Sequence, residues 1–135
     1  MSHWQSLTKI RPADTKFSIY VRMRDRKCAF GVRCIPRELT NWDTGELDIR
    51  GLQCCHFIGR RNEAVRFDPE NGDAGCPKCH DWIDKTPEGQ RWHKAFKIKQ
   101  LGEKGFALLQ LRANTKGNKD DKLTMLYIKQ LMSEL

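Results

Sequence analysis

Six cysteines limit what this chain can fold into more strongly than any other feature of its sequence. They are Cys28, Cys34, Cys54, Cys55, Cys76 and Cys79. Residues 1–11 hold no apolar segment of the kind that directs secretion, so we expect a cytoplasmic protein whose cysteines stay reduced. In that compartment, paired cysteines indicate a metal site or catalysis rather than disulfides.

Two cysteine pairs have spacings that suit a set of metal ligands. Cys76 and Cys79 are separated by two residues, which places both thiolates on one tight turn where they can reach a single Zn²⁺ at ~2.3 Å. Cys28 and Cys34 form a wider pair upstream, and the four thiolates together would close a tetrahedral structural zinc site. Cys54 is an alternative to either upstream ligand, and a cysteine left outside the site is expected to be a small core residue.

The charge of the chain favours a polyanionic partner. Its 135 residues suit one domain, and 25 Lys and Arg against 17 Asp and Glu give a net charge of +8. Residues 1–40 carry a balance of +6, residues 41–75 of −3 and residues 76–135 of +5. Two basic flanks around a mildly acidic centre fit a polyanion held by the flanks, with an ordinary solvated surface as the alternative. No stretch approaches the ~20 apolar residues that cross a bilayer, so no membrane partner is expected.

Apolar spacing predicts the elements of the first half of the chain. Phe17, Tyr20 and Val21 fall at helical spacing, which predicts a helix over Thr15–Asp25 with Asp14 as its N-cap. Two short strands are predicted at Leu52–Ile58 and Arg66–Asp68, with turn segments at Asn41–Gly51 and Pro69–Gly75.

Three helical patterns follow the second cysteine pair. Thr86 followed by Pro87 is typical of a helix N-terminus, with Thr86 as the N-cap. Leu101–Ala113 and Asp120–Leu135 predict two further helices, and the polar segment Asn114–Lys119 predicts a linker between them.

These patterns together predict a small α+β domain. Residues 1–13 are expected to be a flexible N-terminus, residues 14–101 a zinc-stapled core and residues 102–135 a C-terminal helical extension. Trp42 lies near a turn signal in an acidic stretch, and it is expected to pack against the zinc knuckle, with stacking on a base as the alternative.

Residues that suit phosphodiester hydrolysis lie between the cysteine pairs. His56 ends the predicted strand Leu52–Ile58, next to Arg60 and Arg61, and His80 directly follows Cys79. A neutral imidazole can take a proton from water at pH 7, and a divalent ion can stabilise the leaving oxygen of a phosphate. Arginines can hold phosphates by paired hydrogen bonds, so Arg60, Arg61 and, more weakly, Arg66 are candidate DNA contacts.

The segment LQCCHFIGRRNEAVRFDPENGDAGCPKCHDW resembles the HNH (His-Me finger, ββα-metal) endonucleases, and most of all the NinG/Rap-type recombination nucleases of phages. The shared pattern is a strand that ends in His, a following Arg, an aromatic-Asp-x-x-Asn step and a Cys-x-x-Cys pair with a polar ligand after it. The resemblance covers about Phe17–Trp82 and implies that residues 14–101 form an HNH nuclease domain.

The resemblance implies a role for three residues. His56 would be the general base that activates water, Asn71 would brace the loop that carries His56, and His80 would hold the catalytic ion, Mg²⁺ or Mn²⁺ with Zn²⁺ as the alternative. Many relatives have Asp or His as a metal ligand directly before the base, where this chain has Cys55. A thiolate suits Zn²⁺ better than Mg²⁺, so a contribution from Cys55 would change the preferred ion.

The resemblance, together with these residues, therefore implies a metal-dependent DNA endonuclease of a phage or prophage. Its implied substrates are recombination or replication intermediates, including branched DNA, and it would act in the cytoplasm of the host cell. A junction-cutting enzyme is expected to share the two-fold symmetry of its substrate, which makes a homodimer a further expectation. Two alternatives are a non-catalytic zinc-finger DNA-binding protein of a recombination complex and a protein-interaction module that uses the C-terminal helices.

Overall fold

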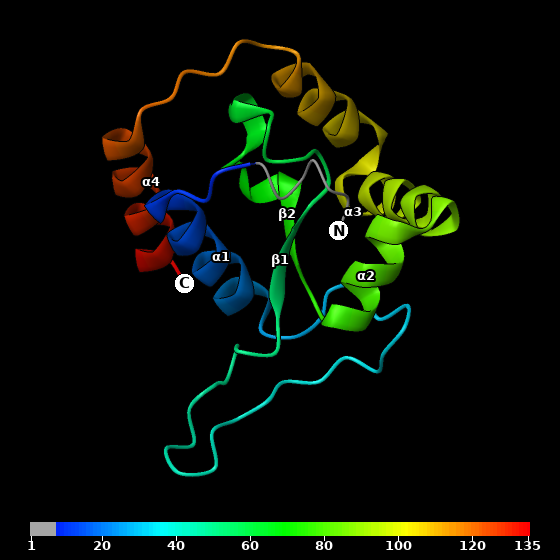
Figure 1. Cartoon of the computed structure of the whole chain (residues 1–135), viewed down its shortest axis with the longest axis vertical. Coiled ribbons are helices and arrows are strands. Elements are labelled where there is room, and N and C mark those ends of the chain that lie inside the picture. The colour runs from blue at the N-terminus through cyan, green and yellow to red at the C-terminus, as the bar shows by residue number, and fades with distance from the viewer. Residues whose placement is uncertain (1–7) are drawn as a thin grey trace.

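A two-stranded antiparallel sheet lies at the centre of the fold, with helices on both sides (Figure 1). The computed structural model describes residues 8–135, and within them strand β1 (Gln53–His56) pairs with strand β2 (Gly72–Gly75). The helices are α1 (Pro12–Asp25), α2 (Pro77–Lys85), α3 (Pro87–Ala113) and α4 (Asp121–Ser133). Helices α1 and α4 lie on one side of the sheet, and α2 and α3 lie on the other. The predicted α+β class is confirmed.

The N-terminal helix begins earlier than its sequence pattern predicts. It starts at Pro12, whose fixed backbone angle suits the first helical position. Asp14 is not the N-cap, because its carboxylate lies in the first turn and accepts a hydrogen bond from the backbone N–H of Arg11 at 2.7 Å. Arg11 and Pro12 therefore belong to the folded part of the chain, while residues 1–7 of the expected flexible terminus lie outside the described residues.

The second strand is not where the sequence predicts it. The prediction of a strand at Arg66–Asp68 is wrong, and strand β2 forms in the segment predicted as a turn. Two short 3-10 helices, η2 (Glu63–Val65) and η3 (Pro69–Asn71), precede it. A Cβ atom added at Gly72 would lie 3.1 Å from the ring of Phe17, and one at Gly75 would lie 2.8 Å from the ring of Phe30. Tight packing therefore selects a strand of small residues, and such a strand lacks the β-branched residues that mark strands in a sequence.

The two faces of the sheet contact different helices, because side chains alternate along each strand. Ala74 is fully buried in the apolar cluster of α1, and Cys54 packs against that same cluster. Cys55 packs instead in the cluster that includes α2. Asp73 also points to this second face, where one of its carboxylate oxygens lies 2.6 Å from Nζ of Lys97 in α3.

Two apolar clusters fill the spaces on either side of the sheet. The cluster on the α1 side consists of Ala13, Phe17, Tyr20, Val21, Ala74 and Ile128. The cluster on the α2 side consists of Cys28, Phe30, Cys55, Cys79 and Ile83. Within the described residues, no helix is both long enough and apolar enough to cross a membrane.

The C-terminal half follows the sequence prediction closely. The hydroxyl of Thr86 accepts a hydrogen bond from the N–H of Gly89 at 2.8 Å and caps α3. Gly102 has φ 75° and ψ 162°, which are not helical angles, and α3 is kinked there. The kink lies at the start of Leu101–Ala113, which the sequence pattern predicts as a separate helix. The linker between α3 and α4 runs against η2, because a Cβ atom added at Gly117 would lie 2.4 Å from the backbone nitrogen of Ala64.

A buried ion pair joins α3 to β2. Lys97 and Asp73 are 0% and 1% exposed, so neither charge has access to water. The ammonium of Lys97 also donates to the carbonyl of Glu70 at 2.7 Å and to Oε1 of Gln100 at 2.6 Å. Gln100 donates in turn to the second carboxylate oxygen of Asp73 at 2.7 Å. A charge buried without its partner would carry a large desolvation penalty, so Lys97 and Asp73 must stay in contact. Their contact therefore fixes the distance between α3 and the sheet.

The substitution Lys97→Met should destabilise the protein strongly, because it leaves the carboxylate of Asp73 buried without a cation. We expect a loss of about 3–5 kcal/mol in the free energy of unfolding, measured by urea denaturation. The control is Lys94→Met at an exposed position of α3, which should change stability by less than about 0.5 kcal/mol. Equal midpoints for the two variants would contradict a structural role for the buried pair.

Candidate metal centre and the predicted active-site residues

Four cysteines from two distant segments form one cluster. The Sγ atoms of Cys28, Cys34, Cys76 and Cys79 all lie within 4.8 Å of one another. The Sγ atoms of Cys34 and Cys79 are 3.7 Å apart. A tetrahedral ion with Zn–S bonds of ~2.3 Å requires sulfur atoms about 3.8 Å apart, so this cluster can hold a metal ion such as zinc. The structure brings the four predicted ligands together, and Cys54 is not a member of this cluster.

Backbone N–H groups donate hydrogen bonds to three of the four sulfurs. Cys76 is the N-cap of α2, and its Sγ accepts a hydrogen bond from the N–H of Cys79 at 3.4 Å. The Sγ of Cys79 accepts one from the N–H of Arg33 at 3.3 Å. Burial alone would raise the pKa of the Cys28 thiol, but backbone N–H groups, first that of Gly31, lower this pKa to about 7. A thiolate is the form that binds a metal ion.

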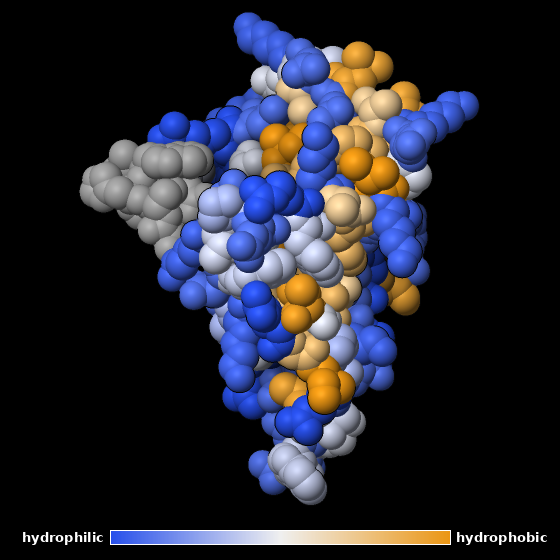
Figure 2. Space-filling model, turned by 90° about the vertical axis from the view of Figure 1, so that its right-hand side faces the viewer, coloured by the Kyte–Doolittle hydropathy of each residue, from blue (hydrophilic) through white to orange (hydrophobic). Residues whose placement is uncertain are grey.

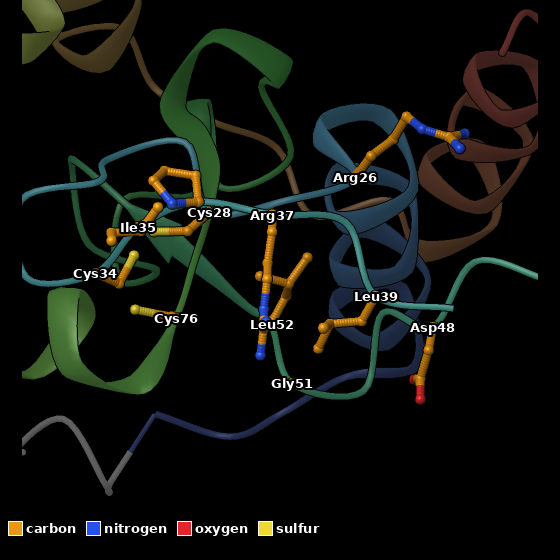
Figure 3. Close-up of a pocket in the computed structure, with 11 residues that line it drawn as sticks. Arg26, Cys28, Cys34, Ile35, Arg37, Leu39, Asp48, Gly51, Leu52 and Cys76 are labelled. Atoms are coloured by element: carbon orange, nitrogen blue, oxygen red, sulfur yellow. The ribbon is translucent and has the colours of Figure 1, made fainter. Parts of the chain in front are cut away.

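The cluster lies at the edge of the fold rather than deep in the core. Figure 3 shows Cys28, Cys34 and Cys76 gathered on one side of a surface pocket, with Leu39 and Leu52 opposite them. Cys28 is buried, whereas Cys34 and Cys76 are half-buried. An ion at this position would cross-link the segment after α1 to the beginning of α2.

The adjacent cysteines of β1 are core residues. Cys55 is 1% exposed and packs in the cluster on the α2 side, and its burial raises the pKa of its thiol well above the ordinary value. Burial also raises the pKa of Cys54, to about 12. Both side chains therefore remain neutral thiols at pH 7. Neither belongs to the four-sulfur cluster. Among the described residues, no group of three or more metal-ligating side chains includes Cys55, which was expected as a possible ligand.

His56 is held in a defined orientation at the end of β1. Its ring lies 5.8 Å from the ring of Phe17 between centroids, and its Nε2 lies 3.0 Å from the carbonyl oxygen of Arg66. A carbonyl can only accept, so Nε2 carries the proton and Nδ1 keeps its lone pair. Burial lowers the pKa of His56 to about 4, which leaves the ring neutral at pH 7.

His80 lies in a different environment, in the first turns of α2. Its Nδ1 is 2.6 Å from Oε1 of Gln53, and its Nε2 is 2.9 Å from a carboxylate oxygen of Asp84. Gln53 and His56 are three residues apart on one strand, so their side chains point to opposite faces. His80 therefore lies across the sheet from His56, and the predicted pairing of a general base with an ion ligand is not formed.

Asn71 occupies the bracing position that the sequence analysis expects of it. It is fully buried, its Oδ1 accepts a hydrogen bond from the N–H of Ile58, and its Nδ2 donates to the carbonyl of Ile58, both at 2.8 Å. Its Nδ2 also lies 3.1 Å from the carbonyl of Val65. These bonds fix both ends of the loop 58–65 that follows His56.

Arg66 is a structural residue, and its prediction as a DNA contact is wrong. It is 7% exposed, and its guanidinium lies 2.6 Å from a carboxylate oxygen of Asp14. It also donates to the carbonyl oxygens of Lys9 at 2.8 Å and Arg60 at 3.3 Å. A guanidinium with all these partners has no free edge for a phosphate.

Three distant backbone segments that carry basic residues meet around the loop 58–65. Arg66 ties the backbone of Lys9 to that of Arg60, and the linker lies against η2. We call this group the basic rim; its members are Lys9, Arg60, Arg61, Lys116 and Lys119. The sequence analysis singled out only Arg60 and Arg61, because the other three become neighbours only through the fold.

Comparison with protein-family models, curated proteins and solved structures gives no match for this chain. Its fold and its sites are therefore interpreted from its own residues. The HNH resemblance stays a prediction that depends on the motif residues alone.

The metal centre can be tested by removing one sulfur at a time. Cys76→Ser should lower the zinc content from about one ion per chain and lower the melting temperature, because a structural zinc site contributes directly to folding. The matched control is Cys54→Ala, which removes a thiol outside the cluster and should keep the zinc. Elemental analysis and thermal unfolding with and without EDTA give the two readouts. Full zinc content in Cys76→Ser would contradict the assignment.

Proposed function

We propose that this chain is a nucleic-acid-binding protein in which a zinc-stapled fold presents the basic rim to phosphates. The observation that carries the proposal is the meeting of residues 9, 60–61 and 116–119 at one place on the surface. Clustered cations are typical of surfaces that bind the phosphate backbone, because binding releases condensed counterions.

Ion pairing next to the basic rim keeps two nearby acids from cancelling its positive charge. Glu63, the acid closest to Arg61 in sequence, lies 2.8 Å from Nη1 of Arg11, and Asp14 pairs with Arg66. These acids are neutralised by arginines that are themselves buried. The excess charge of +8 is therefore carried in part by exposed members of the basic rim.

Zinc has a structural role in this proposal. Four thiolates would fill a tetrahedral coordination sphere, which leaves no open position for a water or a substrate. The ion would hold the cysteine segment after α1 against α2 and would not take part in chemistry.

A metal-dependent DNA endonuclease is the second candidate, and the environment of His56 favours it. The ring has a free Nδ1 lone pair, and Arg60 is close enough to lower its pKa electrostatically. A base beside a phosphate-binding arginine is what hydrolysis of a phosphodiester requires. The resemblance assigns the catalytic ion, Mg²⁺ or Mn²⁺, to His80, which lies on the other face of the sheet. For this reason nucleic-acid binding is proposed first.

Neutralising the basic rim should weaken binding and its dependence on salt. In Arg60→Gln and Arg61→Gln, the slope of log affinity against log salt should fall by up to about one for each lost phosphate contact. Fluorescence anisotropy with a labelled duplex, titrated at several KCl concentrations, measures this slope. The control is Lys85→Gln on α2. Lys85 pairs with Asp81 at 2.9 Å and lies outside the basic rim, so this variant should leave the slope unchanged. Unchanged slopes in both rim variants would contradict the proposal.

The nuclease candidate is tested by His56→Ala. Linear, single-stranded and four-way DNA are incubated with Mg²⁺, Mn²⁺ or EDTA, and products are resolved on denaturing gels. A nuclease should cut in a metal-dependent way, and His56→Ala should lose at least about a hundred-fold in rate while it keeps DNA affinity, because the general base is gone. Absence of metal-dependent cutting by the wild-type chain, with binding intact, leaves the binding function alone.

A further inference from the structure

A hairpin projects from the fold beside the metal centre. It spans residues 36–51, leaves the cluster just after Cys34 and is closed by a bridge between Thr40 and Leu47. It is the lowest part of the molecule in Figure 1, and the molecule tapers to this end in Figure 2. Trp42 at its tip is 100% exposed, so the expectation that it packs against the zinc knuckle is wrong.

The backbone of this tip is rigidly organised. The side-chain oxygen of Asn41 accepts hydrogen bonds from the N–H groups of Asp43 at 2.9 Å and Thr44 at 3.1 Å. Gly45, with φ 73°, donates to the carbonyl of Asn41 at 2.8 Å, which closes the turn. The indole of Trp42 is therefore presented on a fixed turn. Because the backbone is already ordered, binding has to fix only the two side-chain torsions of Trp42, which lowers its entropic cost.

Charge divides the hairpin into a positive root and a negative tip. Arg26 pairs with Glu38, and Arg50 pairs with Asp48, so these four charges cancel. Among the described residues, the cations left without an acidic partner near the root are Lys27, Arg33 and Arg37, and the acids left near the tip are Asp43 and Glu46. A polyanion would be attracted to the root and repelled from the tip.

We propose that Trp42 stacks on an unpaired base of a nucleic acid whose backbone phosphates are held by the root of the hairpin. The inference rests on the proposed nucleic-acid binding and narrows its target to single-stranded or branched molecules. Every base offers a π face to an indole, and this face carries no charge that the tip carboxylates repel. The five residue-to-residue steps from Arg37 to Trp42 span at most about 17 Å, so one short nucleic-acid strand can reach both residues.

The experiment compares Trp42→Ala with the wild-type chain on a single-stranded oligonucleotide and on a blunt duplex of the same length. Stacking on one base contributes about 1–3 kcal/mol, so single-strand affinity should fall about 5- to 150-fold. Duplex affinity should stay the same. The wild-type tryptophan fluorescence should be quenched by the single strand, and Trp42→Ala should lose this quenching. Because Trp42 is fully exposed, its removal should leave the melting temperature unchanged.

An abasic oligonucleotide of the same length and charge separates stacking from attraction to phosphates. On this strand, wild type and Trp42→Ala should bind equally, because no base remains to stack. A Trp42→Ala penalty that persists on the abasic strand, or that is equal for single strand and duplex, would overturn the assignment. So would an unchanged single-strand affinity, which would assign Trp42 to a protein partner instead. If the wild-type chain binds neither oligonucleotide, the proposed function itself fails.

Discussion

The four-sulfur cluster is the constraint on which the first half of the molecule depends. Between the end of α1 and the start of β1, the chain runs through residues 26–52 with one isolated bridge and no helix or strand. So long an irregular segment has few backbone hydrogen bonds to hold it. Cys28 and Cys34 attach its beginning to α2, and the hairpin projects from that anchored point. A metal ion bound there would add to the apolar contacts that Phe30 makes in the cluster on the α2 side.

The narrow sheet imposes the second constraint, because it has two faces and only four residues in each strand. One face belongs to α1, and the other belongs to α2 and α3. The position of a residue in the strand therefore decides which helices it meets, and His56 and His80 are separated by this rule rather than by sequence distance. The same rule sends Asp73 to Lys97 and Ala74 to the opposite cluster. Hydrolysis as the resemblance implies it would need His56 and His80 on the same face of the sheet. Binding of phosphates by surface cations does not, which is why nucleic-acid binding is the function the geometry favours.

Local rules account for the features that could be predicted. The two cysteine pairs, the Thr86–Pro87 helix start and the polar linker each depend on chemistry within a few residues, and the structure keeps all of them. Strand β2 could not be predicted, since its small residues are selected by the rings of Phe17 and Phe30, which come from distant segments. Trp42 was misjudged for a related reason, because an exposed tip and a buried turn have the same local pattern.

The sequence by itself determined the two cysteine pairs that cluster, the excess of positive charge and the helices of the second half, because spacing and composition act over short distances. Only the tertiary structure decided which arginines remain available. Arg66 forms a buried ion pair with Asp14, whereas the segments that carry Lys9, Lys116 and Lys119 lie near Arg60 at the surface. The physical reason is that a charge acts through its neighbours in space, and those neighbours are chosen by packing between segments far apart in the chain.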